Sequence, residues 1–171
     1  GPLARLNTCD FIPSPLAQKE FEIYKAYTCG KPNGKSMHMH WARLIEMLHA
    51  AEMMRELLKD PDLYFGELIK KGVRTAEGVG VIEAPRGTLF HHYKVDENDL
   101  INMCNLIVST TSNNEAMNRS INWVAKNVMS GHAVIPEGML NQVEVVIRAY
   151  DPCLSCATHA IGQMPLVVEL L

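Results

Sequence analysis

The stretch Asp151-Pro152-Cys153-Leu154-Ser155-Cys156-Ala157-Thr158-His159 decides how this 171-residue chain is interpreted. Cys153 and Cys156 are two residues apart, so a tight turn would direct both sulfurs toward one metal ion. Pro152 fixes φ just before the first cysteine, which favours such a turn. Apolar residues recur at helical spacing in residues 138–150, so we expect the cysteine pair to follow a helix.

A C-x-x-C pair alone leaves two kinds of site open, a zinc half-site and a dithiol redox pair. A closed zinc site needs about four ligands. The other cysteines, Cys9, Cys29 and Cys104, are solitary and distant in the sequence, so the stretch supplies at most three ligands. We therefore expect the missing ligands to come from outside these residues.

The composition is that of a globular chain, with 47% hydrophobic and 20% charged residues. A net charge of −3 without a basic run argues against a nucleic-acid partner. No apolar run reaches the ~18 residues of a membrane span. Five irregularly spaced cysteines argue against a disulfide framework and indicate a reducing, cytoplasmic compartment.

The hydrophobic periodicity predicts a mainly α fold with a small β component. The expected helices are 15–27 with Ser14 as N-cap, 36–59, 61–74, 96–107 with Asp96 as N-cap, one starting near Glu115, and one starting at Pro136. The expected strands are 79–82, 88–95 and a terminal strand at 166–171, and a hydroxyl-rich loop is expected at 108–114. Cys104 is expected in the core, and His38, His40 and His49 are interpreted as polar or helix-packing residues.

The D-P-C-L-S-C-A-T-H string resembles the C-terminal signature of the large subunit of nickel–iron hydrogenases. The resemblance implies that Cys153 is a terminal nickel ligand and that Cys156 bridges nickel and iron. It also implies that Asp151 orients the site by hydrogen bonding toward Arg86. His159 would bind a separate magnesium or iron ion.

Glu83-Ala84-Pro85-Arg86-Gly87 is a second match, because it resembles the family's E-A-P-R-G segment. By itself the segment predicts a β-hairpin with a surface arginine. The resemblance implies that Ala84, Pro85 and Arg86 lie at the cofactor. It also implies that Arg86 has an electrostatic and positioning role. A guanidinium stays protonated and offers a fixed fork of donors, which suits an anionic cyanide ligand.

A third segment, Val108-Ser109-Thr110-Thr111-Ser112-Asn113-Asn114, resembles the family's Ser/Thr-Asn loop, whose hydroxyl hydrogen-bonds an iron-bound cyanide. Thr110 matches that hydroxyl position. The chain departs from the commoner pattern at Ser109 and Ser112, where proline and tryptophan are usual.

Together these matches imply that residues 1–171 are a single C-terminal fragment of a hydrogenase large subunit, in the helical bundle of that family. The reaction would be reversible oxidation of dihydrogen at a nickel–iron centre whose iron carries CO and CN ligands, with Cys153, Arg86 and Asp151 in catalytic roles. The implied partners are an iron–sulfur small subunit together with electron-acceptor subunits of the branch that reduces viologen dyes, a deazaflavin or NAD. A maturation endopeptidase would remove residues 160–171 after His159, and the fragment alone would be inactive.

Two other classes of function remain open. One is a catalytically inactive relative, as in respiratory complex I, although that lineage lacks the cysteines and this chain has Cys153, Cys156 and Arg86. The other is an unrelated zinc or dithiol module, in which Cys9, Cys29 or Cys104 would complete the ligand shell.

Overall fold

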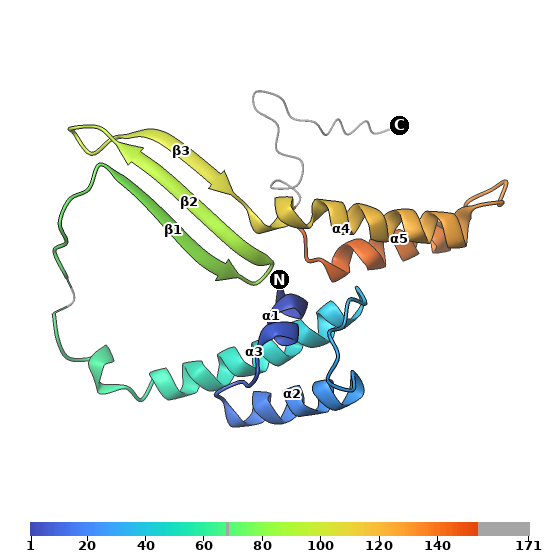
Figure 1. The fold of residues 1–171 in the computed structure, drawn as a ribbon, viewed down its shortest axis with the longest axis horizontal. Helices are drawn as coiled ribbons and strands as arrows, with labels where there is room; N and C mark the ends of the chain where they lie inside the picture. The colour runs from blue at the N-terminus through green and yellow to red at the C-terminus, as the bar shows by residue number, and fades with distance from the viewer. Residues whose placement is uncertain (68, 154–171) are drawn as a thin grey trace. The chain divides into compact units, whose positions relative to one another are not determined.

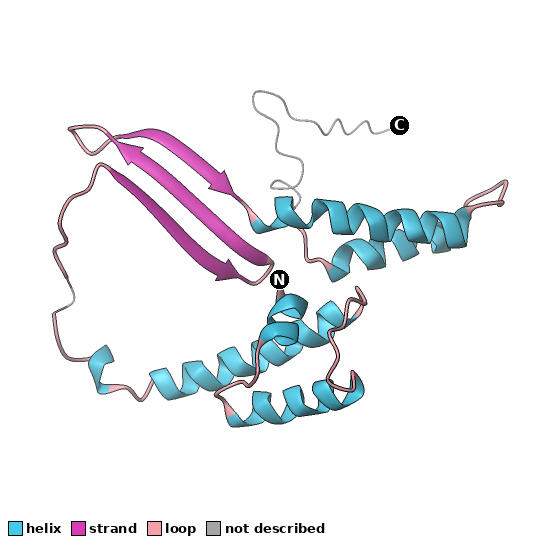
Figure 2. Cartoon of the chain, in the orientation of Figure 1, coloured by secondary structure: helices cyan, strands magenta, loops and turns pink. Residues whose placement is uncertain are grey.

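The computed structural model describes residues 1–67 and 69–153 (Figure 1). Figure 2 colours the helices and the strands differently. The helices and helical turns are α1 (Pro2–Thr8), α2 (Pro15–Tyr27), α3 (His38–Leu57), the 3₁₀ turn η1 (Pro61–Leu63), α4 (Ser109–Val124), the π-helical turn η2 (Ala125–Met129) and α5 (Glu137–Ala149). The strands are β1 (Glu77–Ala84), β2 (Gly87–Val95) and β3 (Ile101–Ile107). This confirms a mainly α fold with a small β component. Within the described ranges, no helix combines the length and apolarity that crossing a bilayer requires.

The chain divides into two compact units, which are described separately. Among the described residues, the first unit comprises Gly1 and residues 80–91 and 105–153. The second unit comprises residues 2–79 and 92–104.

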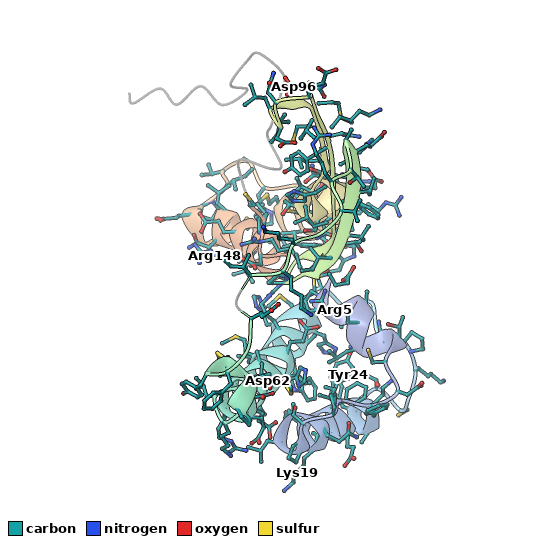
Figure 3. The ribbon with its side chains drawn as sticks, turned by 90° about the vertical axis from the view of Figure 1, so that its left-hand side faces the viewer. Arg5, Lys19, Tyr24, Asp62, Asp96 and Arg148 are labelled. Atoms are coloured by element: carbon teal, nitrogen blue, oxygen red, sulfur yellow. The ribbon has the colours of Figure 1, made fainter. Side chains whose placement is uncertain are left out.

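The core of the second unit lies between α3 and the two helices α1 and α2. Its fully buried members are apolar residues from all three helices, namely Leu3, Leu6, Ala17, Phe21, Tyr24, Ala42 and Ile45. The rings of Tyr24 and Trp41 meet edge to face with centroids 5.2 Å apart, a favoured aromatic geometry. Figure 3 shows Lys19 on the outer side of α2, away from this core.

The helix α2 has the predicted bounds, but its N-terminus is capped differently from the prediction. Ser14 makes no side-chain cap, and its hydroxyl instead pairs with His49 Nδ1 at 2.8 Å. The cap comes from α3, because the buried Glu52 carboxylate accepts hydrogen bonds from the amides of Leu16 at 3.0 Å and Ala17 at 2.8 Å. A capping side chain from another helix is invisible to a local sequence pattern.

The helix α3 confirms the long helix expected over residues 36–59. Ile45 is buried against α1 and α2, whereas Leu44 and Leu57 are exposed. Two histidines have structural partners: His49 pairs with Ser14, and His38 pairs with Asn33.

The prediction of a helix over residues 61–74 is wrong for the described residues of that segment. Only the 3₁₀ turn η1 forms, and the rest of the described segment is irregular and exposed. The Asp60 side chain accepts from the amide of Asp62 at 2.9 Å, so the helix-start signal produces one turn. No buried surface is present in this described segment to extend the turn.

The strands β1 and β2 confirm the predicted hairpin, and β3 joins them in an antiparallel sheet of order β1-β2-β3. The helix expected over residues 96–107 is wrong. Asp96 Oδ1 does accept backbone amides, from Asn98 at 2.8 Å and Leu100 at 3.0 Å, but it caps the tight loop between β2 and β3. Cys104 lies exposed on β3 rather than in the core.

In the first unit, α4 and α5 lie side by side (Figure 1). The loop predicted at 108–114 is wrong, because α4 already begins at Ser109. Hydroxyl residues are tolerated there since the first-turn amides lack intrahelical partners. The helix α5 confirms the helix expected from Pro136, which is its N-cap residue.

Candidate functional site

The turn between β1 and β2 carries Arg86 and needs a glycine after it. Gly87 has φ +141°, a conformation that side chains rarely adopt. A Cβ on Gly87 would lie 3.3 Å from the Gly1 nitrogen and 3.3 Å from Ser109 Cβ. The turn is therefore pressed against the first residue of α4.

The main chain of Arg86 is fixed from two sides. Asn113 Nδ2, on α4, donates a hydrogen bond to the Arg86 carbonyl oxygen at 2.8 Å. Gly1 approaches the same oxygen so closely that a Cβ there would lie 3.0 Å from it. Both contacts define where the Arg86 side chain leaves the backbone.

Asp151 meets the Arg86 side chain from the end of α5. Helix α5 ends at Ala149 with Tyr150 as C-cap, and Asp151 then takes φ +50°, the left-handed conformation that commonly ends helices. Arg86 Nε donates to the Asp151 carbonyl oxygen at 2.5 Å and lies 3.4 Å from its carboxylate Oδ2. None of the contacts described for Arg86 uses its terminal amino groups, which remain available as donors.

Cys153 is brought to the start of α4. Its backbone amide donates to Thr110 Oγ1 at 3.3 Å, and Thr110 is only 2% exposed. Cys153 itself is partly buried. A thiol, a buried hydroxyl and a guanidinium are thereby gathered around the segment 151–153.

Tyr150 anchors this segment, although it belongs to none of the sequence motifs. Its buried ring places the hydroxyl 2.8 Å from Ser120 Oγ and 3.1 Å from the Ala116 carbonyl oxygen, to which it donates. The available signal was an aromatic residue with a polar end immediately before the D-P-C motif. Asn113 was also missed as a partner of Arg86, because its contact is between residues 27 positions apart.

The structure brings Arg86, Asp151, Thr110 and Cys153 together, with Ala84 at the end of β1 and Pro85 in the turn. Cys156, His159 and the segment 160–171, including the terminal strand expected at 166–171, lie outside the described residues. Within residues 1–67 and 69–153, no group of three or more His, Cys, Asp or Glu side chains is arranged to hold a metal ion. Cys9, Cys29 and Cys104 are each exposed.

Comparison with known proteins identifies the family. Residues 27–159 match the family model described as nickel-dependent hydrogenase. The chain is 56% identical to the NAD-reducing hydrogenase HoxS subunit beta of Cupriavidus necator, over 99% of this chain and 36% of that protein. It is 46% identical to a component of the vhc F420-non-reducing hydrogenase of Methanococcus voltae, over 98% of this chain and 36% of that protein.

A solved structure gives the same result. The crystal structure of an NAD⁺-reducing [NiFe]-hydrogenase in the H2-reduced state superposes with a TM-score of 0.85 at 50% identity, covering 93% of this chain and 35% of that one. The chain spans about a third of the length of these relatives. These matches do not favour an unrelated zinc or dithiol module. The chain belongs to the nickel-dependent hydrogenase family.

Proposed function

We propose that this chain acts as the C-terminal part of a hydrogenase large subunit, which catalyses reversible oxidation of dihydrogen to protons and electrons at a nickel–iron centre. The observation that carries the proposal is the contact of Arg86 with Asp151, two residues from Cys153, whose amide is held by Thr110. The relatives named as hydrogenases match this chain over nearly all its length, which supports the same role.

The donor set fits a nickel–iron centre. Thiolates are soft ligands that suit late transition metals, and Cys153 and Cys156 would be the residues of this chain that hold the centre. Two further thiolates would come from the part of the large subunit outside these residues, and the iron would carry CO and CN. When bound, the centre supplies heterolytic cleavage of dihydrogen.

Arg86 would stabilise charge beside that centre. Arg86 Nε donates to Asp151, which leaves the two terminal amino groups of Arg86 to donate to an anionic cyanide or to developing negative charge. Because the site fixes both the backbone and the Nε of Arg86, these donors are positioned before the reaction begins. A guanidinium is a poor general base, so the role proposed for Arg86 is electrostatic.

Thr110 and Cys153 would complete the site from the other side. The Thr110 hydroxyl accepts from the Cys153 amide and retains its own O–H, which can donate to a second cyanide. Thiolates are favoured near helix N-termini, and the Cys153 amide lies at the first turn of α4. The Cys153 sulfur would then accept the proton released from dihydrogen.

The remaining assignments concern maturation and location. We propose that an endopeptidase cleaves between His159 and Ala160 once nickel is inserted, and that His159 then binds a structural magnesium or iron ion. The irregularly spaced cysteines support a reducing, cytoplasmic location.

An iron–sulfur small subunit would carry electrons to acceptor subunits, and we propose NAD as the final acceptor. The support is the 56% identity to the NAD-reducing HoxS beta subunit, compared with 46% for the F420-non-reducing relative. Hydrogen-dependent reduction of NAD by the assembled complex tests this choice, since reduction of viologen dye without NAD would contradict it.

The function itself is tested by Arg86→Lys in the full-length protein, assembled with its partner subunits. A lysine keeps the charge but loses the fork of donors, so the hydrogen-dependent rate of dye reduction should fall by about 100-fold at unchanged nickel content. Arg119→Lys is the matched control, because Arg119 lies exposed on α4 and pairs with Glu115 of the same helix. A rate for Arg86→Lys equal to that of the control would contradict the proposal.

A further inference from the structure

The Tyr150 hydroxyl takes part in a small hydrogen-bond network between the neighbouring helices α4 and α5 (Figure 1). It lies 2.8 Å from Ser120 Oγ, and both hydroxyl oxygens lie 3.1 Å from the Ala116 carbonyl oxygen. Each hydroxyl carries one hydrogen, so whichever of the two donates to the other leaves the second free to donate to Ala116. The two hydroxyls therefore fix the side chain of Tyr150 to α4.

Tyr150 and Cys153 attach the two ends of one short segment to the same helix. The Cys153 amide donates to Thr110 Oγ1, in the first turn of α4, at 3.3 Å. The Ala116 contact lies six residues, or roughly 9 Å, further along that helix. Between the two attachment points are only Asp151 and Pro152, and a proline has a fixed φ. The main chain of Asp151 is therefore held from both sides.

The main chain of Asp151 is also what Arg86 contacts most closely. Arg86 Nε lies 2.5 Å from the Asp151 carbonyl oxygen and 3.4 Å from the carboxylate Oδ2. A carbonyl oxygen moves only when the backbone moves, and this backbone follows directly from Tyr150, the C-cap of α5. The orientation of the guanidinium consequently depends on where Tyr150 is held.

We propose that Tyr150 is a positioning residue for the nickel–iron site. Its hydroxyl fixes the main chain of Asp151, and the Asp151 carbonyl oxygen in turn orients the donors of Arg86. Tyr150 acts through these two residues and touches no reacting group. The inference rests on the proposed function, which gives the Arg86 donors an anionic cyanide to meet.

Tyr150→Phe in the full-length, assembled complex tests the proposal, because it keeps the buried ring and removes only the hydroxyl. Nickel content should be unchanged, and the thermal midpoint should fall by less than about 4 °C. The rate of hydrogen-dependent dye reduction should fall about tenfold, as for other residues that orient groups at a metal site. The infrared stretching frequencies of the iron-bound cyanides should shift, because the Arg86 donors move. Tyr64→Phe, at a 73% exposed tyrosine, is the matched control and should match wild type in all four measurements.

Ser120→Ala is a second variant, which remains informative even where Tyr150→Phe fails to assemble. It leaves the Tyr150 hydroxyl able to donate to Ala116, so the infrared shift and the loss of rate should be smaller than in Tyr150→Phe. Because Ser120 acts only through Tyr150, the double variant should behave as Tyr150→Phe does. A wild-type spectrum and rate in Ser120→Ala, or a double variant with the product of both single effects, would overturn the proposal.

The same measurements separate the positioning role from a merely structural one and from the proposed function. Wild-type cyanide frequencies and rate in Tyr150→Phe overturn the positioning role alone, provided that the wild-type complex contains nickel and reduces the dye. A rate that falls only in proportion to nickel content also overturns it, since Tyr150 would then serve stability. A wild-type complex without nickel or without hydrogen-dependent activity refutes the proposed function, and the positioning role with it.

Discussion

At the scale of single residues, Asp151 shows a conflict between conformation and chemistry. Its φ of +50° is one that glycine adopts freely, whereas a residue with a Cβ adopts it at a cost of about 1–2 kcal/mol. Asp tolerates this region better than most residues. The short hydrogen bond from Arg86 Nε goes to the Asp151 main-chain oxygen, and the Asp151 carboxylate adds a longer contact of 3.4 Å to the same nitrogen.

Two substitutions at Asp151 test the role of its carboxylate in different ways. Asp151→Asn tolerates the left-handed backbone but removes the charge, and Asp151→Gly relieves the backbone and removes the side chain. Both should lower the rate of hydrogen-dependent dye reduction by about 10–100-fold, as expected for a residue that orients a group at a metal site. The thermal midpoint should not fall for either variant, and wild-type rates in both would exclude a role for the carboxylate.

Gly87 provides a purely steric prediction. Gly87→Ala introduces a Cβ at φ +141° with neighbours at 3.3 Å, so the free energy of unfolding should fall by about 1–3 kcal/mol. Gly80→Ala is the control, because nothing lies within 4 Å of a Cβ there and its φ is ordinary. Chemical denaturation of the purified protein measures both, and equal stability of the two variants would show that the turn relaxes.

At the scale of secondary-structure elements, α2 depends on a carboxylate from α3. Burial alone would raise the pKa of Glu52, but hydrogen bonds from the amides of Leu16 and Ala17 and from the Ser14 hydroxyl outweigh it. With Arg55 also contributing, the pKa of Glu52 is held below its ordinary value of 4.5. The ionised form is thus the one that caps α2.

The sign of the resulting pH dependence follows from this lowered pKa. The Glu52 contribution to stability is complete above about pH 4.5 and is lost as the pH falls through the lower pKa of the folded state. Glu52→Gln should therefore lower the thermal midpoint at neutral pH and flatten its decline in acid. Glu56→Gln, at an exposed position of α3, should change neither, and identical acid profiles for wild type and Glu52→Gln would contradict the capping role.

Local patterns predicted the elements whose signals are self-contained. The start of α2 follows from Pro15 in its first turn, and the β1–β2 hairpin follows from the two strands predicted on either side of Pro85-Arg86. Local patterns gave the wrong element where the same residue type can begin a helix or close a tight loop. Asp96 looks like a helix cap, yet a carboxylate satisfies the amides of a tight loop equally well, and pairing with β2 makes residues 101–107 a strand.

The candidate site was predictable in its members but not in its arrangement. The motifs, through their resemblance to a known family, named Arg86, Asp151, Thr110 and Cys153, which the structure brings together, while their roles stay predictions. The supports of the site are contacts across long separations, Asn113 to Arg86 and Tyr150 to Ser120, and no local pattern encodes them. The sequence predicts a loop at 108–114, whereas α4 begins at Ser109, because whether a polar segment forms a first helical turn depends on what it packs against.

At the scale of the whole molecule, several surfaces are not covered by any other part of the chain that the structure describes. In β1 every residue before Ala84 is exposed, and β3 is exposed apart from Met103. Antiparallel sheets normally bury at least one face, and α3 also exposes Leu44 and Leu57. These surfaces agree with a chain that matches about a third of the length of each relative.

The central claim is that Cys153 holds nickel, and the nickel content of the full-length complex carrying Cys153→Ala tests it most directly. The matched control is Cys9→Ala, which removes an exposed thiol far from the motif in the sequence. Metal analysis of the purified complexes should give wild-type nickel for Cys9→Ala and less than about a tenth of it for Cys153→Ala, with hydrogen-dependent activity lost in parallel. Wild-type nickel in the Cys153→Ala complex would contradict the account.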